Sequence, residues 1–288
     1  MDSTELKKLL MEKSRTMPNK ARRVTEYLLS NMREASFKSI GDVADELEVS
    51  KAQLVRVAQM LGFSGYAELK GCLQNAVLEQ INPAAFIARE VTNEDSISER
   101  IFRAEHANID DTMSQLKDED IDKFCKIMKK ANNIYFMGWG ISSLVVELFQ
   151  LRLVVMGCKA RLLQRGSLSL WEQVRSVKAD DALVVGELPS YAFEVTEAVE
   201  IAKKRGAKII TVTDSAAAPV CRFADLSFFV SAASPTFGSS IIGPLFLAHV
   251  LTSELAESLG YHAKTAFEEQ EKFLRDERIF HPTFGLKY

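Results

Sequence analysis

The chain has 288 residues and a formal net charge of −3, with 47% hydrophobic and 26% charged residues. This length suggests two domains, and this composition excludes a wholly disordered chain. The small negative charge excludes a polycation that coats nucleic acid, so any contact with DNA must come from a local basic patch. The four cysteines are widely spaced and fit neither a disulfide framework nor a zinc site, which indicates a reducing compartment.

The beginning of the chain and its longest apolar runs give no sign of a membrane. Residues 1–17 are charged throughout and lack the apolar core of a signal peptide. The longest apolar stretches, such as 241–251, are shorter than the roughly 20 residues that a membrane-spanning helix needs. We therefore expect a cytoplasmic protein with no membrane partner.

Short helical patterns occupy the first 80 residues, and no strand pattern precedes residue 130. Ile40, Val43, Ala44 and Leu47 follow the i, i+3, i+4, i+7 spacing of an apolar helix face. Ser39 stands where it can cap the start of this helix, with an acidic residue three positions later. The pattern predicts a helix that packs one face on a core.

A second amphipathic segment, 51–61, follows a short turn, with Ser50 placed as its N-cap. Two helices joined by a tight turn predict a helix-turn-helix, whose second helix can lie in the major groove of DNA. Its outward polar residues suit base and phosphate contacts, and an earlier basic cluster suits the DNA backbone. The expected DNA-binding residues are Ser50, Lys51, Gln53, Arg56 and Gln59, together with Lys20, Arg22 and Arg23. An ordinary helical bundle with a solvated charged face is the alternative, and Glu48, where such turns often have glycine, favours it.

Beyond residue 130 the pattern changes to β-branched runs that alternate with helical runs. Strands are expected at 133–137, 160–163, 182–185, 208–213 and 226–230. Helices are expected at 142–156, 169–177, 193–204, 219–223 and 241–259. This alternation predicts a doubly wound α/β domain with a five-stranded parallel sheet. The chain is thus divided into an all-α helix-turn-helix domain (1–80), a helical connector (81–120), the α/β domain (121–262) and a tail (263–288).

A glycine- and serine-rich loop follows the first predicted strand. Open parallel sheets bind ligands beyond the carboxyl ends of their strands. The helix that begins at this loop offers backbone N–H donors, and the serines add hydroxyl groups. The candidate ligand contacts in this loop are Gly138, Trp139, Gly140, Ser142 and Ser143. A tight turn without a ligand is the alternative.

Residues 39–70, SIGDVADELEVSKAQLVRVAQMLGFSGYAELK, carry the most specific motif of the chain. The Val-Ser turn, the arginine of the second helix and the run LGFSGY resemble the N-terminal domain of the MurR/RpiR family of bacterial transcriptional regulators. The resemblance implies that this domain binds DNA and that the second half is a sugar isomerase (SIS) domain, which is a doubly wound α/β fold. Gln53 and Val57 stand where the family often has Thr and Phe, so the operator sequence is expected to differ.

The loop after the third predicted strand departs from this family. The resemblance implies a Ser-x-Ser-Gly-x-Thr loop that cradles a phosphate, but residues 187–192 read Glu-Leu-Pro-Ser-Tyr-Ala. Glu187 repels a phosphate dianion and Pro189 removes an N–H donor. We expect the ligand to be a carbohydrate derivative whose phosphate, if present, is recognised more weakly than in the family. The expected contacts outside the first loop are Glu187, Ser190, Tyr191, Ser239 and Ser240.

These features favour a DNA-binding transcriptional regulator whose SIS domain binds a carbohydrate derivative, phosphorylated or not, and modulates operator binding. We expect no catalytic residue, metal or cofactor, because none of the four histidines has a metal-ligand spacing. One alternative is an aldose–ketose isomerase of the SIS type, in which Glu147, Glu187 or His249 would have to serve as acid or base. The other is a DNA-binding protein that uses its SIS domain only to oligomerise. We expect a homodimer or homotetramer, because one small DNA-binding domain is weakly specific alone.

Overall fold

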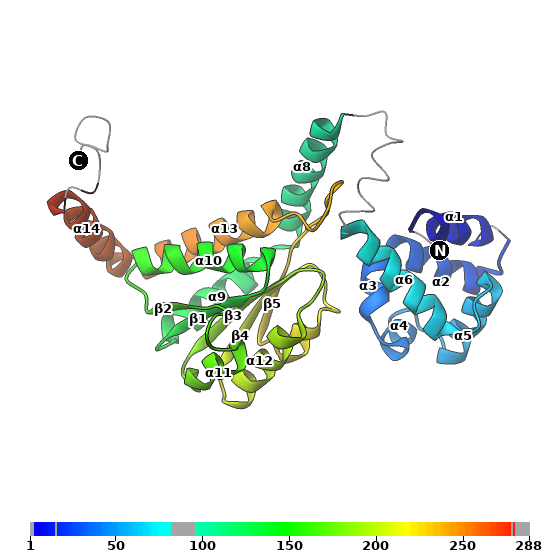
Figure 1. The fold of residues 1–288 in the computed structure, drawn as a ribbon, viewed down its shortest axis with the longest axis horizontal. Helices are drawn as coiled ribbons and strands as arrows, with labels where there is room; N and C mark the ends of the chain where they lie inside the picture. The colour runs from blue at the N-terminus through cyan, green and yellow to red at the C-terminus, as the bar shows by residue number, and fades with distance from the viewer. Residues whose placement is uncertain (1–2, 15, 82–95, 278, 280–288) are drawn as a thin grey trace. The chain divides into compact units, whose positions relative to one another are not determined.

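The computed structural model describes residues 3–14, 16–81, 96–277 and 279 (Figure 1). The chain divides into two compact units. One comprises residues 1–106, 215–218 and 233–240, and the other comprises residues 107–214, 219–232 and 241–288. Helix α8 (Ile97–Gln115) begins in the first unit and ends in the second. Within the described ranges, no helix has the length and the apolar character that a membrane span requires.

Six helices within residues 3–81 build a single apolar core. Their bounds are α1 Ser3–Ser14, α2 Asn19–Ser30, α3 Met32–Phe37, α4 Ile40–Glu46, α5 Lys51–Leu61 and α6 Tyr66–Ile81. The apolar positions of each helix point inward, and Leu6, Leu28, Leu54 and Leu73 are fully buried. Helix α5 packs against α2, α4 and α6. The amphipathic pattern of α5 therefore leaves its polar side chains outside the core.

A five-stranded parallel sheet forms the centre of the second unit and confirms the predicted fold class. Its strands are β1 Ile134–Gly138, β2 Ala160–Leu163, β3 Ala182–Glu187, β4 Lys208–Thr213 and β5 Leu226–Phe229, in the order β2-β1-β3-β4-β5. Every residue of β1 and β3 is buried, as in sheets that are covered on both faces. The strand order reverses direction between β1 and β3, where Gly138 lies opposite Gly186. Such a switch point is where open α/β sheets bind ligands.

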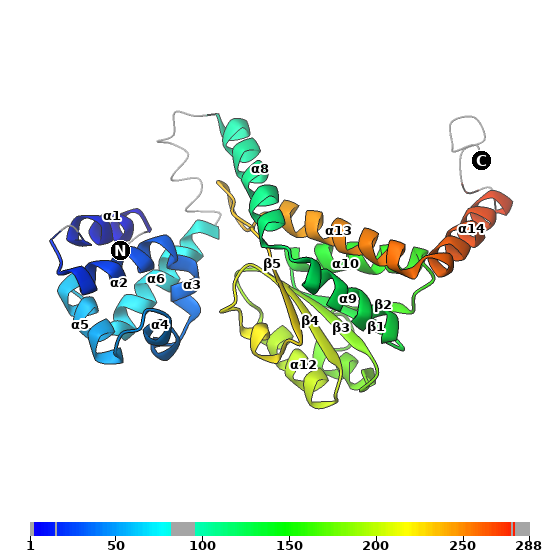
Figure 2. The same cartoon turned by 180° about the vertical axis from the view of Figure 1, so that it is seen from behind.

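Helices cover both faces of this sheet (Figures 1 and 2). On one face lie α9 (Asp118–Lys130), α10 (Ile141–Val155) and α13 (Ile242–Leu259), and α13 contacts both of the others. The other face carries α11 (Leu170–Gln173) and α12 (Phe193–Lys204). The short 3₁₀ helices are η1 Val174–Ser176 and η2 Pro219–Phe223, and α14 (Tyr261–Asp276) follows α13. The aromatic rings of Phe124, Phe136 and Phe149 pack between the first helix layer and the sheet.

Candidate functional site

Helices α4 and α5 form a helix-turn-helix whose two starts are capped by serines. The hydroxyl of Ser39 accepts the N–H of Asp42, and the Asp42 carboxylate accepts the N–H of Ser39, which completes the expected capping box. The hydroxyl of Ser50 accepts the N–H of Gln53 at 3.1 Å. The Val49 N–H donates to the carbonyl of Ala44 at 2.9 Å and closes the turn. These bonds fix where the second helix begins.

The turn contains a residue in the left-handed backbone region. Glu48 has φ 53°, a conformation that costs an L-residue with a side chain free energy and that glycine adopts readily. The helix-turn-helix geometry is therefore formed at Glu48 without the glycine that is frequent at this position. The departure from the usual sequence therefore introduces local backbone strain at Glu48.

Helix α5 separates its buried and exposed faces as the sequence predicts. Its buried residues are Leu54, Val57, Ala58 and Leu61. Lys51, Arg56 and Gln59 are exposed, and Gln53 is half-buried. The aliphatic stem of Lys51 lies beside Gly41 of α4. Its Cε is 3.4 Å from the position that a Cβ on Gly41 would occupy. An exposed arginine and glutamine on one helix face can read base edges in a major groove.

The predicted basic cluster lies on α2. Lys20, Arg22 and Arg23 are all exposed there. The Arg22 guanidinium also donates to the carbonyl of Met17 at 3.3 Å, which restrains this side chain at the start of the helix. Together the three charges give α2 a basic amino-terminal half.

A cavity of about 230 Å³ lies at the switch point of the sheet. Trp139, Gly140, Ile141 and Ser142, from the loop after β1 and the start of α10, line one side. Residues 186–192, from the end of β3 and the loop that follows, line the other. The structure therefore brings both predicted ligand loops into one cavity, because β1 and β3 are neighbours in the sheet.

The remaining predicted contacts lie outside this lining. Gly138 allows β1 to pack closely against the start of α10. A Cβ added to it would lie 2.9 Å from the carbonyl oxygen of Ser142. Ser143 is half-buried, and its hydroxyl donates to the carbonyl of Gly140 at 2.7 Å. Ser239 and Ser240 belong to the first unit, where the Ser240 hydroxyl donates to Glu105 at 2.6 Å.

Bonds within the protein occupy several hydrogen-bond donors of the cavity wall. The Leu188 N–H donates to the hydroxyl oxygen of Ser142 at 3.1 Å and joins the two loops. The N–H groups of Ser142 and Tyr191 donate to the carbonyls of Trp139 and Leu188. Pro189 has no N–H. Among the described residues, no hydrogen bond engages the N–H groups of Trp139, Gly140, Ile141, Ser190 and Ala192, so backbone donors remain in the cavity wall.

Glu187 ends β3 and is 3% exposed. Among the described residues, neither of its carboxyl oxygens has a hydrogen-bond partner of good geometry. Burial raises the pKa of Glu187 to about 8, and the charge of Asp214 acts in the same direction, whereas the backbone N–H of Val220 lowers it. The Tyr191 hydroxyl donates to Asp214 at 2.8 Å, so this second carboxylate adjoins the loop. Two carboxyl groups, those of Glu187 and Asp214, therefore lie close together beside this loop.

Ser190 occupies the loop position where the phosphate-binding motif has glycine. Its φ is 94°, in the left-handed region. A glycine at this position would adopt that backbone conformation readily, and the serines, the threonine and one N–H donor of the motif are also replaced in this loop.

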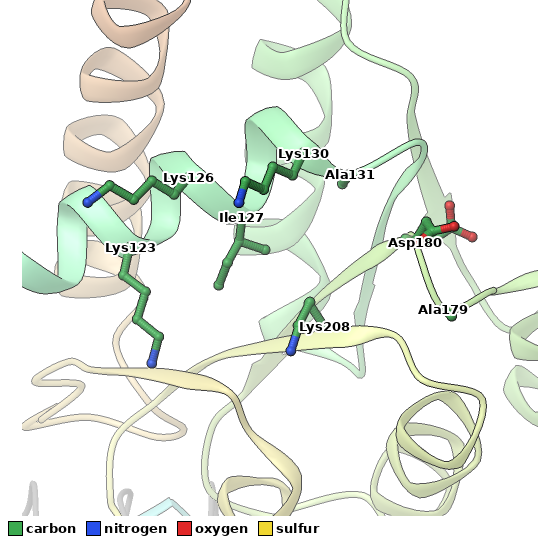
Figure 3. Close-up of a pocket in the computed structure, with 9 residues that line it drawn as sticks. Lys123, Lys126, Ile127, Lys130, Ala131, Ala179, Asp180 and Lys208 are labelled. Atoms are coloured by element: carbon green, nitrogen blue, oxygen red, sulfur yellow. The ribbon is translucent and has the colours of Figure 1, made fainter.

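A second cavity, of about 310 Å³, lies at the opposite, amino-terminal edge of the sheet (Figure 3). Lys123, Lys126 and Lys130 reach it from α9 and Lys208 from the start of β4, while Asp180 lies apart from them. Sequence analysis missed this cluster, although the spacing of the three α9 lysines places them on one helix face. The ammonium of Lys208 lies 3.3 Å from Asp225, and Lys123 donates to the Asp225 carbonyl. Its lysines are thus partly engaged, and it lies away from the switch point.

Two family models match the chain. Residues 4–80 match the helix-turn-helix domain of the rpiR family, and residues 127–254 match the SIS domain. The chain belongs to the RpiR family. The RpiR regulator of Escherichia coli K12 is 27% identical over 218 residues, which cover 75% of this chain and 73% of that protein. The HexR regulator of Pseudomonas aeruginosa is 29% identical over 217 residues, which cover 72% and 73%. This RpiR-family protein is a helix-turn-helix transcriptional regulator with a SIS domain.

Solved structures share the fold of this RpiR-family chain. The Vibrio vulnificus NanR protein complexed with ManNAc-6P has a TM-score of 0.63 at 23% identity, and the match covers 94% of this chain and 98% of that chain. The sugar isomerase domain of an RpiR transcription factor from Sphaerobacter thermophilus has a TM-score of 0.59 at 20% identity, covering 62% and 99%. At these identities the likeness establishes the architecture alone.

Proposed function

We propose that this RpiR-family regulator binds its operator through α5 and changes its affinity for DNA when a carbohydrate derivative occupies the switch-point cavity. The observation that carries this proposal is the cavity itself, which the two ligand loops predicted from sequence build together. Acting on chromosomal DNA places the protein in the cytoplasm. The effector and the operator are the two partners.

The exposed face of α5 supports the operator contacts. We assign base contacts to Arg56, Gln59 and Gln53, because arginine pairs with guanine and glutamine with adenine. Lys51 and the α2 cluster of Lys20, Arg22 and Arg23 are assigned to phosphates. Ser50 is used as an N-cap and contributes through its position at the start of the helix.

The chemistry of the cavity supports a carbohydrate ligand with little dependence on phosphate. The NanR complex with ManNAc-6P supports a sugar derivative as the ligand class. In this chain, however, the loop after β3 offers Glu187 and Pro189 in place of hydroxyl and N–H donors. A dianion would meet acidic neighbours there, whereas sugar hydroxyls can use both the donors and the acceptors of the wall.

Isomerisation is less well supported, and we propose that the protein has no catalytic role. An aldose–ketose isomerase needs a base near the substrate carbon and an acid near the carbonyl. Glu187 lines the cavity, but Glu147 and His249 do not, and His249 is exposed on α13. A DNA-binding domain also has no part in that reaction.

Fluorescence anisotropy with an operator obtained by in vitro selection tests the proposal. A carbohydrate effector should change operator affinity by about 5- to 150-fold, the usual range of allosteric coupling. Ser142→Ala removes the hydroxyl that joins the two loops, and it should weaken the effector response while leaving the affinity of the effector-free protein unchanged. An operator affinity that no sugar or sugar phosphate alters would refute the sensor. Turnover of a sugar phosphate by the purified protein would instead support the isomerase.

A further inference from the structure

Helix α8 is held against the second unit by polar residues. A helix that packs on a globular domain normally buries an apolar face. The structure describes α8 throughout, and its two buried residues are Asn108 and Thr112. The large apolar side chains of Phe102 and Met113 on the same helix are exposed. Because no apolar side chain of α8 is fully buried, the position of this helix depends on the contacts of Asn108 and Thr112.

Both buried residues contact Ser231, which follows β5. The Ser231 hydroxyl donates to the side-chain oxygen of Asn108 at 2.9 Å, and the Ser231 N–H donates to the hydroxyl oxygen of Thr112 at 3.0 Å. Asn108 and Thr112 are four residues apart and share one face of the helix. The two bonds therefore fix the rotation and the axial position of α8 relative to the end of β5. We call Asn108, Thr112 and Ser231 the polar clamp, and all three belong to the second unit.

The start of α13 packs directly on the polar clamp. A Cβ added to Gly243, in the first turn of α13, would collide with the carbonyl oxygen of Ser231 and would lie 2.8 Å from the hydroxyl oxygen of Thr112. The carboxyl-terminal half of α8 and the first turn of α13 lie side by side in both views (Figures 1 and 2). Three segments that are far apart in sequence thus meet without room for a methyl group, so a displacement of one must displace the others.

Packed helices connect the polar clamp with the switch-point cavity. Ile141 and Ser142, in the first turn of α10, line the cavity. Helix α10 packs against α13, and Phe149 and Leu247 of these two helices are fully buried in one core cluster. Helix α13 begins beside the clamp, and α8 is the segment through which the chain passes from the DNA-binding domain to the SIS domain. The cavity, α10, α13, the clamp and α8 form one contiguous series of contacts, of the kind that can carry coupling between two sites.

We infer that the polar clamp couples the two domains, so that a ligand in the switch-point cavity changes operator binding through Ser231 and α8. The inference rests on the proposed function, because it names how that regulation is transmitted. The clamp residues do not line the switch-point cavity and are not assigned to DNA contacts, so they are positioning residues. The scarcity of buried apolar contacts on α8 is typical of the low-stability elements that move in allosteric proteins.

Fluorescence anisotropy with the full chain and an operator obtained by in vitro selection tests this coupling. The ligand panel contains glucose, galactose and mannose, the 2-acetamido derivative of each, and the 6-phosphates of all six. In the wild type, the most active member should change operator affinity by about 5- to 150-fold. Ser231→Ala removes the hydroxyl that donates to Asn108, and Thr112→Val removes the acceptor of the Ser231 N–H. Each substitution should reduce the change to about twofold or less.

The other affinities of the clamp variants distinguish lost coupling from lost binding. Calorimetry should give each variant an affinity for the same sugar within about threefold of the wild-type value. The operator affinity without ligand should also stay within about threefold. Melting curves show whether each variant is folded, and one folded variant is sufficient because the two substitutions remove different bonds.

Ser227→Ala is the matched control for Ser231→Ala. Ser227 is also a half-buried serine, and its hydroxyl oxygen accepts from the Thr211 hydroxyl at 2.9 Å, but this bond joins β5 to β4 and does not involve α8. The control should therefore lose a bond of the same length and keep the wild-type response to the sugar.

The outcomes separate the coupling from the proposed function. A response that the folded clamp variants lose and Ser227→Ala keeps supports the inference. A full response in a folded clamp variant overturns it and leaves the carbohydrate sensor standing. An equal loss in Ser227→Ala, or a loss of sugar binding in the clamp variants, also overturns it, because the response then follows domain stability or the cavity itself. If no member of the panel changes operator affinity in the wild type, the proposed function fails and the inference fails with it.

Discussion

Glu187 is the residue at which this chain departs most from the phosphate-binding loop of its family. A serine at this position donates a hydrogen bond to an anion, whereas a buried carboxylate repels one and is itself destabilised. The structure places Glu187 in the cavity wall beside Asp214. A buried carboxyl group thus stands where the motif offers a phosphate a hydroxyl donor.

The raised pKa of Glu187 makes stability depend on pH. Its folded value of about 8 lies above the ordinary 4.5, so the folded state holds a proton that the unfolded state releases. The contribution is fully present below pH 4.5 and is lost as the pH rises towards 8, at about 1.4 kcal/mol per pH unit. Glu187→Gln should flatten this part of the dependence and be more stable than wild type at pH 8. Denaturant unfolding of both proteins at several pH values measures this dependence. If the free energy of unfolding changes with pH equally in the wild type and in Glu187→Gln, the raised pKa of Glu187 is contradicted.

Glu48 stores strain in the turn before α5. A residue with a side chain at φ 53° destabilises the folded state by about 1–2 kcal/mol. Glycine removes this strain, but it loses more backbone entropy on folding, so the net gain is smaller. Glu48→Gly should therefore raise the free energy of unfolding by about 0.5–1 kcal/mol. Ala52→Gly, at an exposed position of α5, should lower it by up to about 1 kcal/mol. Equal effects of the two substitutions in urea unfolding would show that the turn is unstrained.

At the scale of elements, the proposed operator contacts assign sequence recognition to α5. Arg56 is exposed on it, so Arg56→Ala should weaken operator binding by about 1–3 kcal/mol and relax the choice of one base pair. Lys51→Ala should weaken binding to operator and random DNA alike and reduce the salt dependence. Competition binding with operator and random duplexes distinguishes the two. An Arg56→Ala variant that folds and retains full operator affinity would place recognition elsewhere.

Sequence patterns predicted the elements well because their signals are local. The alternation of β-branched and helical runs located all five strands to within two residues, and the faces of α5 followed from Leu54 and Val57. The contents of the cavity depend on contacts between distant segments. The bond from the Leu188 N–H to Ser142 spans 46 residues of sequence, and the role of Gly138 in packing on α10 depends on how two elements approach. No local pattern shows that Glu187 is buried without a partner.

At the scale of the whole molecule, an apolar surface of the second unit suggests assembly. Leu151 and Val154 of α10 are 55% and 49% exposed, and Phe267 of α14 is 41% exposed. A groove of about 420 Å³ runs between α10, α13 and α14 beside them. Exposed apolar patches of this kind mark interaction surfaces, and an operator with twofold symmetry needs a dimer.

We expect the protein to be at least a dimer through this surface. A charge introduced there, as in Leu151→Glu, should dissociate it and weaken operator binding, because each DNA-binding domain then acts alone. Leu168→Glu is the matched control, since Leu168 is 52% exposed but lies in a loop outside the groove. Light scattering gives the mass of each protein. A monomeric wild-type protein at micromolar concentration would contradict the prediction.

The function proposed for this protein depends on what the switch-point cavity binds. Calorimetric titration of the wild-type protein with matched pairs of sugars and sugar phosphates measures this directly. We predict that a carbohydrate derivative binds and that its phosphorylated partner gains no more than about tenfold in affinity. The contrary result is a phosphorylated sugar that binds about a hundredfold tighter or more than its parent, with this gain lost when residues 187–192 are substituted. That result would show that the cavity recognises the phosphate group, as the family resemblance implies.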